Sequence, residues 1–269
     1  MHGVAALAAH SLRRSRTLLA VLVVVLAGFE ILLVAGATTL QETGTFANFA
    51  ALVPPFVRQV FGDSLIVFMS FAGIVCFGYF HPMIVAALGA FVIAIATEPV
   101  AEIETRFIDV VLARPLRRAA LIARSVLLLF ALPALVVAVM LVATLLGLRW
   151  LAPRGAGVHA PLIAALAVNL WVLLECIGGV SLAVAAASRR RSSAAGVAGI
   201  AMLALFFLDY LARIWKPAAS IAWASPFHYF DAMAMVVGRP LPASHVALLG
   251  IAGALGMALA FVLFTRRDL

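Results

Sequence analysis

The sequence predicts an all-α membrane protein with six transmembrane helices, and three observations support this. Of the 269 residues, 66% are hydrophobic and only 11% are charged, whereas soluble domains usually carry about 25% charged residues. The mean hydropathy of +1.18 also excludes an ordinary soluble domain. Apolar runs of the length that crosses a bilayer, about 20 residues, recur along the chain. We therefore expect one membrane domain over residues 1–269, with no soluble appendage.

The six expected spans are apolar runs of spanning length. They cover Leu18–Leu40, His81–Thr97 with part of the preceding stretch, Val126–Leu148, Pro161–Ala187, Ala194–Ile214 and His245–Phe264. The stretch Leu65–Thr97 is apolar over 33 residues, too long for one upright helix and short for two. His81-Pro82 interrupts it, because the residue before a proline avoids helical dihedrals. We expect Leu65–Phe80 to be an outer, interfacial or re-entrant piece that leads into the second span.

The positive charges predict the orientation. Arginine and lysine concentrate on the cytoplasmic side of membrane proteins. With the N-terminus inside, the inner segments hold thirteen of these residues and the outer segments six. Both termini are therefore expected in the cytoplasm. The net charge of +8 follows this membrane pattern, so it indicates contact with lipid and no nucleic-acid partner.

Two segments outside the spans are expected at the membrane surface. Residues 1–17 place Val4, Leu7 and Leu12 at helical spacing beside three arginines, which predicts an amphipathic interfacial helix; a frayed tail is the alternative. A cleaved signal peptide is disfavoured, because its apolar core is only about 7–15 residues long. The extracytoplasmic segment 216–244 carries aromatic residues typical of the interfacial belt, and its prolines divide it into short pieces.

A charged island lies between the second and third spans. Residues 98–124 read EPVAEIETRFIDVVLARPLRRAALIAR, with four acids first and arginines towards the end. This order suits a short helix, because the helix dipole favours negative charge at its start and positive charge at its end. A polar helix held at the membrane between two spans is well placed to be displaced by a cytoplasmic partner protein.

Two acidic residues fall near the centres of expected spans. Glu30 lies in the first and Glu175 in the fourth, where an ionised carboxylate costs several kcal/mol unless it faces the protein interior or a wet cavity. They either line a transport path, contacting substrate or relaying protons, or bond to a neighbour such as Asn169 or Ser181 and help the helices pack. Asp209 and Arg213 are simpler, since their spacing predicts an i,i+4 ion pair.

Small residues predict close helix packing in the later spans. Gly178-Gly179 lies one turn after Glu175. It would let the fourth span flex or approach a neighbouring helix closely.

Motifs for catalysis are missing from the sequence. A phosphate-binding P-loop needs a glycine-rich turn that ends in lysine, and the single lysine, Lys216, lies between Trp215 and Pro217. Neither an HExxH zinc helix nor a G-x-S-x-G nucleophile turn is present. Cys76 and Cys176 lie in apolar runs and are expected to pack as small hydrophobic residues. We expect no enzyme, no metal and no cofactor in this chain.

Three places in the sequence resemble the ABC-2 type transporter permeases. Glu102-Ile103-Glu104, the run from Ile108 to Pro115 (IDVVLARP) and Arg118 resemble the first cytoplasmic loop of that family. The run from Ser225 to Asp231 (SPFHYFD) resembles its segment before the last span, and the ending FTRRDL resembles its usual finish. The chain departs from the family at Arg106-Phe107, where Gly-Thr is usual.

The resemblance implies the permease subunit of an ABC exporter in the bacterial inner membrane. It would pair with a second permease subunit, identical or related, and with two separate ATP-binding subunits that carry ATP and magnesium. Residues 98–124 would form the coupling loop. Glu102, Glu104 and Arg118 would lock its helix at the membrane surface, and Asp109, Leu112 and Pro115 would contact the ATPase.

Two other functions stay open at this point. A stand-alone secondary transporter would use Glu30 and Glu175 for proton coupling, but it is expected to show internal repeats, and none is convincing between residues 1–134 and 135–269. A membrane scaffold that transports nothing is the third possibility. The sequence does not name a substrate.

Overall fold

The computed structural model describes residues 2–46, 67–105, 118–153 and 157–266; side chains are described from residue 16 onward and, at the start of the third stretch, from residue 120. Helices account for nearly all of this part, and it contains no strand. The long helices are α1 (His2–Glu42), α6 (Pro82–Ala96), α9 (Arg118–Leu151), α10 (Ala160–Ala187), α11 (Arg191–Ala212) and α14 (Ala243–Thr265). The short ones are α5 (Phe71–Cys76), η1 (Phe77–Tyr79), α7 (Glu98–Glu104), α12 (Lys216–Ala219), η2 (Ala222–Ala224), η3 (Pro226–Tyr229) and α13 (Ala232–Val236).

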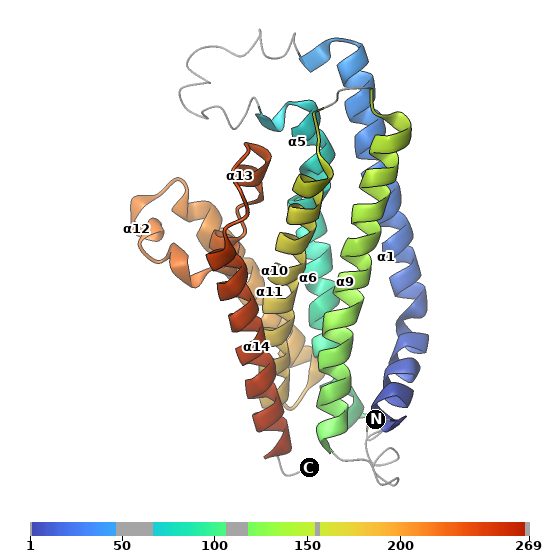
Figure 1. Ribbon diagram of the computed structural model, residues 1–269. Helices are drawn as coiled ribbons and strands as arrows, with labels where there is room; N and C mark the ends of the chain where they lie inside the picture. Colours follow the sequence, from blue (N-terminus) through green and yellow to red (C-terminus); the bar gives the residue numbers. More distant parts are fainter. Residues whose placement is uncertain (1, 47–66, 106–117, 154–156, 267–269) are drawn as a thin grey trace.

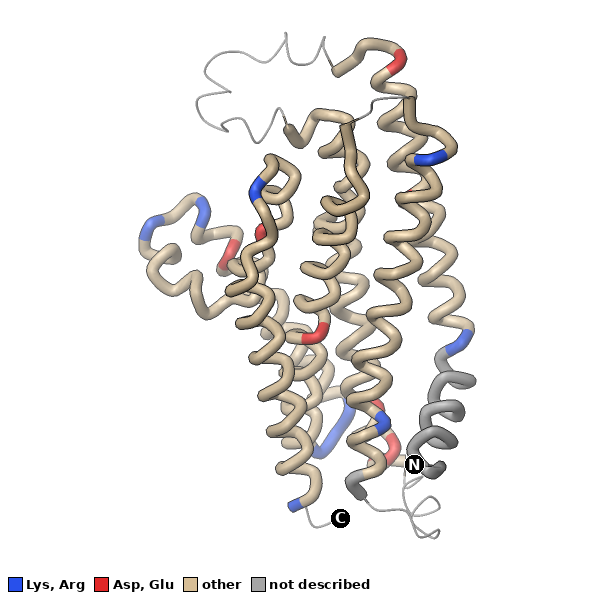
Figure 2. The backbone as a smooth tube through the Cα atoms, in the orientation of Figure 1, with Lys and Arg blue, Asp and Glu red and all other residues tan. Residues whose placement is uncertain are grey.

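Six stretches of helix are long and apolar enough to cross a membrane. They are Arg16–Glu42, Phe71–Ala96, Ala120–Leu151, Ala160–Ala187, Arg191–Ala212 and Ala243–Thr265. This confirms the predicted fold class, an all-α multi-pass membrane protein with six spans. Figure 1 shows the start of α1 and the end of α14 at the same end of the bundle, as an even number of crossings requires. The charged residues gather mostly towards the two ends of the bundle and on the connection between α11 and α14, as the coloured backbone in Figure 2 shows.

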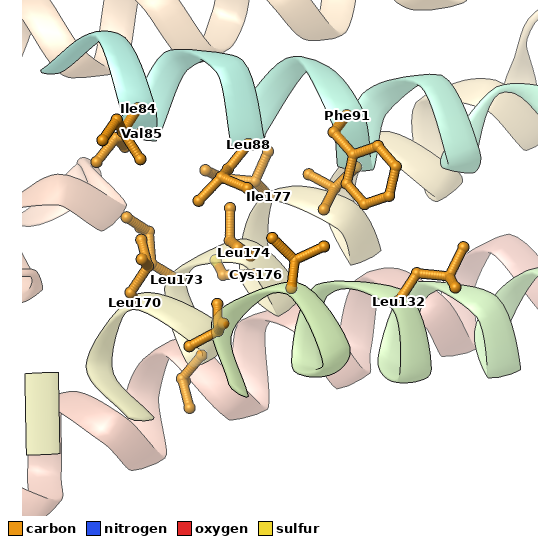
Figure 3. Close-up of a cluster of buried hydrophobic side chains, with 14 of the residues drawn as sticks. Ile84, Val85, Leu88, Phe91, Leu132, Leu170, Leu173, Leu174, Cys176 and Ile177 are labelled. Carbon is orange, nitrogen blue, oxygen red and sulfur yellow. The ribbon is translucent and has the colours of Figure 1, made fainter. Parts of the chain in front are cut away.

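Helix α10 forms the centre of the bundle. It packs against α14, α9, α6 and α11, while α1 packs mainly against α9. Figure 3 shows a cluster of side chains between α6, α9 and α10, among them Leu88, Leu132 and Leu173, and all three are buried. Because lipid tails are as apolar as these leucines, close packing of side chains holds the helices together more than exclusion of water does.

The first helix is longer than its span. Residues from His2 to Glu42 form one helix, so the helical state predicted for residues 1–17 is confirmed from His2 onward. The predicted boundary at Leu18 is not a break in the helix. The physical reason is local: no proline or glycine occurs between Val4 and Ala27, and these are the residues that most often interrupt a helix.

The long apolar stretch before the charged island supplies one crossing. The predicted interruption at His81-Pro82 is present, because His81 is the N-cap of α6, its Nδ1 accepts a hydrogen bond from the backbone N–H of Met83, and Pro82 begins the helix. On the N-terminal side, α5 and η1 pack against α1, and Tyr79 is fully buried. From Phe71 onward, the piece predicted to lead into the second span is thus packed on α1 and belongs to the stretch Phe71–Ala96 that is apolar and long enough to cross a membrane.

Helix α9 begins earlier than the predicted third span and contains a proline. It starts at Arg118, so the last residues of the predicted loop 98–124 are already helical. Pro133 lies inside it, where a proline removes one backbone hydrogen bond and commonly bends the helix. The side chains of Thr144 and Ser125 bond back to the carbonyls of Met140 and Leu121 within this helix.

Glycines allow α10 and α14 to approach very closely. A Cβ atom on Gly253 would lie 2.8 Å from the carbonyl oxygen of Glu175, and one on Gly256 would lie 2.5 Å from the carbonyl carbon of Gly179. Gly179 in turn faces the backbone of Gly253. The close approach expected at Gly178-Gly179 is thus present at Gly179, and its partner is the sixth span.

The connection between α11 and α14 consists of short helices, as its prolines predicted. Ser225 caps η3 by accepting from Phe227 N, and Asp231 caps α13 by accepting from Ala234 N. The segment lies beside the bundle towards the end opposite the chain termini (Figure 1).

Candidate functional site

The charged island begins with a short helix at the end of the bundle where α1 starts. Helix α7 follows α6 almost directly, since Thr97 ends one helix and precedes the other. Pro99 lies in its first turn, where its missing N–H costs nothing, and Glu98 supplies the acid that the start of a helix favours. Pro99, Val100 and Ala101 are buried, so one side of α7 packs on the bundle.

A buried ion pair joins α7 to α9. Arg124 Nη1 donates to Glu102 Oε1 at 2.7 Å, and the two residues are 1% and 5% exposed. Neither the Nε nor the Nη2 of Arg124 has a hydrogen-bond partner among the residues that the structure describes. Two charges withdrawn from water hold each other strongly only in good geometry, and removing either one leaves an uncompensated buried charge.

The second acid of the island joins α7 to α11. Glu104 is exposed, and its Oε2 accepts a hydrogen bond of 3.0 Å from the backbone N–H of Arg191. Arg191 is the first residue of α11, so the carboxylate lies where a helix presents unpaired N–H groups and positive dipole charge. The two acids therefore attach α7 to the starts of two different spans.

Only part of the predicted coupling set falls within the described residues. Glu102 and Glu104 hold α7 against the bundle, as described above. Asp109, Leu112 and Pro115 lie outside the described residues, and Arg118 is the first residue of α9 with its side chain outside them.

Two partners were missed from the sequence. Glu102 pairs with Arg124, the last residue of the predicted loop 98–124, and the structure places this arginine in helix α9. Glu104 accepts from the backbone N–H of Arg191, which lies outside the predicted loop 98–124. The available signal for Arg124 was its position among alanine and leucine residues at the start of an apolar run, where an unpaired arginine would be costly.

Glu30 lies in a closed polar cluster between α1, α9 and η1. It is fully buried. Its Oε2 accepts a hydrogen bond of 3.0 Å from Thr144 Oγ1, and the Tyr79 hydroxyl lies 3.0 Å from the same threonine oxygen. Gly78 lies directly against the carboxylate, where a Cβ atom would collide with Glu30 Oε1. A bonded neighbour was one of the two expectations for this residue, and that neighbour is Thr144 rather than Asn169 or Ser181.

The other intramembrane acid has a different environment. Glu175 is 8% exposed on α10, and its Oε1 has no hydrogen-bond partner among the described residues. Its backbone carbonyl lies at the close contact with Gly253 of α14. Asn169 on the same helix donates to Met235 Sδ at 3.8 Å, not to either acid. The contacts of Glu30 and Glu175 are thus with different elements.

A second charged group lies near the other end of the molecule. Arg213 Nη2 donates to Asp209 Oδ2 at 2.9 Å, which confirms the predicted i,i+4 pair. His228 Nδ1 lies 3.8 Å from Asp209 Oδ1, and this connects η3 to the end of α11.

The fold and these contacts define a multi-pass helical membrane protein with a polar helix attached at one end of its bundle. No protein-family model matches the chain, and no curated protein matches it.

Proposed function

We propose that this chain is the permease subunit of an ABC exporter, driven by a separate ATP-binding subunit. The proposal rests on the resemblance of three segments to ABC-2 type permeases, and the attachment of α7 supports it best. A helix that passes on movement must be coupled to the spans it moves. Helix α7 has such coupling at two points, through Glu102 to α9 and through Glu104 to α11.

The mechanism follows from that attachment. The loop that continues from α7, with Asp109, Leu112 and Pro115, contacts the ATPase. ATP and magnesium bind between two ATPase subunits and draw them together, and each loop follows its ATPase. The displacement reaches the starts of α9 and α11 through the two acids of α7. The spans then alternate between inward-open and outward-open arrangements, and no covalent chemistry occurs in this chain.

The partners and location belong to the same proposal. A second permease subunit, identical or related, completes the transport path, and two ATPase subunits lie on the cytoplasmic side of the bacterial inner membrane. The outward faces of α1 and α11 carry exposed apolar side chains such as Val24 and Ile200, which suit either lipid or the second permease subunit.

The test is affinity purification of the tagged chain from its native membrane, followed by mass spectrometry and an ATP hydrolysis assay. We expect an ATP-binding-cassette subunit to co-purify. Asp109→Arg should abolish that association, because the loop would then present the wrong charge to the ATPase. Glu42→Arg is the matched control, because it makes the same charge change at an exposed position at the opposite end of the chain's first span.

A further variant separates binding from transmission. In the Glu104→Lys variant, part of the ATPase should still co-purify, but its movement should no longer reach α11. The Glu104→Gln variant should keep both the ATPase and the transmission of its movement, because an amide oxygen still accepts from Arg191 N–H. If the wild-type chain purifies without any ATPase, or Asp109→Arg behaves like Glu42→Arg, the permease proposal is wrong. A proton-coupled transporter that uses Glu30 and Glu175 would then be the next candidate.

A further inference from the structure

A cavity of about 320 Å³ lies within the later part of the bundle, away from α7 and from Glu30. Helices α10, α11 and α14 form its walls, and η2 and η3 cover one end. Lining side chains include Cys176 and Ser181 from α10, Ala201 and Leu205 from α11, and Ala252 from α14.

The chemistry of the lining restricts the ligand. Among the residues that the structure describes, no charged side chain lines the cavity, and the walls are alanine, valine, leucine, isoleucine, methionine, proline, phenylalanine and tryptophan apart from two serines, a thiol and a tyrosine. The Ser225 hydroxyl is already used, since it donates to the Leu205 carbonyl at 2.8 Å. A sugar, phosphate or ion would lose its hydration here without compensation. The ligand must therefore be apolar.

The position of the cavity gives an apolar ligand a route into it from outside the bundle. Helices α11 and α14 each pack against α10 but scarcely touch each other, so the cavity lies behind a gap between two spans. The outward faces of these spans carry exposed apolar side chains, Ile200 and Leu203 on α11, Ile251 and Leu255 on α14. Apolar faces of this kind suit contact with lipid hydrocarbon, and the apolar lining of the cavity continues them inward.

The covered end lies where a lipid headgroup would be. The covering segment is fixed to α11 by the Ser225 bond and by an edge-on contact of Phe227 with Phe206, whose ring centroids are 5.3 Å apart. Beside the cavity, Tyr229 donates to the Trp223 carbonyl at 2.9 Å, and Trp223 is exposed. Tryptophan and tyrosine are enriched at the level of the headgroups. An apolar chain in the cavity would therefore have its polar end near Trp223.

We propose that this cavity binds one acyl chain of a membrane lipid, which enters between α11 and α14 with its headgroup beside Trp223 and Tyr229. Small-molecule sites usually measure about 300–1,000 Å³, so this cavity lies at the small end and admits one chain rather than a whole lipid. The site is independent of any ATPase and is present in the single chain.

The test uses a phospholipid with a photoactivatable diazirine in one acyl chain. The full chain is reconstituted into vesicles of phosphatidylethanolamine and phosphatidylglycerol that contain a small fraction of this probe. After irradiation, mass spectrometry maps the attachment sites. We expect adducts on the cavity-lining residues Ile177, Ser181 and Leu205, in addition to adducts on the outward faces.

Two pairs of variants decide whether the cavity is the site. Ala201→Phe and Ala252→Phe fill the cavity from opposite walls and should remove the cavity adducts. Ala204→Phe and Ala254→Phe add the same ring on the same helices at exposed positions that do not line the cavity, and they should leave the adducts unchanged.

Adducts confined to outward residues such as Ile200 and Ile251 in the wild type would overturn the proposal. Cavity adducts that persist in folded Ala201→Phe or Ala252→Phe would also overturn it. If one of the two cavity-filling variants fails to fold, the filling variant on the other wall and the adduct positions in the wild type still decide whether the cavity is the site.

Discussion

At the scale of single residues, the placement of charge inside this bundle follows one rule: each buried charged group described here either has a partner or is a carboxylate. Arg124 is 1% exposed and has Glu102 at 2.7 Å. Glu30 and Glu175 carry no basic partner in the ion pairs of the described residues. A carboxyl group can become neutral by taking up a proton, while an arginine cannot lose its charge in a protein. The arginine is therefore the residue that needs its counter-ion.

The Glu102–Arg124 pair gives the first prediction at this scale. Glu102→Gln should lower the free energy of unfolding by about 3 kcal/mol, because it leaves a buried guanidinium without a counter-charge. The double exchange of Glu102→Arg with Arg124→Glu should recover part of that loss. Unfolding in detergent can be followed by a thiol-reactive dye in a Cys176→Ala background, because the remaining Cys76 is buried and does not line the cavity, and it becomes reactive only when the bundle opens.

The exposed pair supplies the control. Arg213→Gln breaks the Asp209–Arg213 pair, in which the arginine side chain is 56% exposed. Exposed pairs are usually worth about 1 kcal/mol or less, so this change should shift unfolding only slightly. Equal effects of Glu102→Gln and Arg213→Gln would contradict the view that burial makes the first pair important.

At the scale of elements, the most extensive contact between two described helices is that of α10 with α14. Three glycines, Gly179, Gly253 and Gly256, face the partner helix at distances that no side chain could occupy. Within a membrane, helices associate through such close packing. The last span is therefore held to the central helix by shape rather than by charge.

Glycine substitutions on one helix test this contact. Gly253→Ala should destabilise the bundle by about 1–3 kcal/mol, because the new methyl group meets the backbone of Glu175 and the helices must move apart. Gly250→Ala on the same helix meets no atom within 4 Å and should be neutral or slightly stabilising, since alanine favours helix more than glycine does. Thermal unfolding in detergent measures both. A Gly253→Ala protein as stable as Gly250→Ala would show that the helices do not meet at this face.

At the scale of the whole molecule, the distribution of arginine and the even number of spans predict a definite orientation. A cysteine at Thr43, exposed just after the first span, should react with a membrane-impermeant maleimide added to intact cells. A cysteine at Arg266, exposed after the last span, should react only after permeabilisation. The native cysteines are buried and give little background. The reverse pattern would place the termini outside and α7 away from any cytoplasmic partner.

The sequence was sufficient to predict the spans and insufficient to predict the contacts between them. Five of the six spans lie within a few residues of their predicted limits, because a run of apolar residues bounded by charge depends only on local composition. The second span was predicted as His81–Thr97 with part of the preceding stretch, and that part begins at Phe71, because a proline that starts one helix still allows another helix to precede it. Residues 1–17 were predicted as a helix separate from the first span because the chain becomes more apolar after residue 17. The helical propensity does not change at that point, and α1 continues through it.

The candidate site shows the same division. Glu30 was recognisable as an acid inside an apolar run, but its partner Thr144 is 114 residues away, and nothing in the local pattern selects one threonine over another. Glu102 and Glu104 were recognisable as island acids, while Arg124 and Arg191 became their partners only through the way α9 and α11 begin. A single sequence records which groups need partners, and the helix packing decides which partners they receive.

Helix α9 carries polar contacts in both of its halves, and a proline separates them. Arg124 lies nine residues before Pro133 and Thr144 eleven residues after it, so the ion pair to α7 and the bond to Glu30 are about 30 Å apart along the axis. A straight helix without proline would move as one unit, so any displacement of α7 would also displace Thr144 and its bond to Glu30. The bend that Pro133 permits divides α9 into two halves. If α7 moved, the half of α9 that carries Arg124 would be able to tilt at Pro133 while Thr144 in the other half kept its bond to Glu30 of α1.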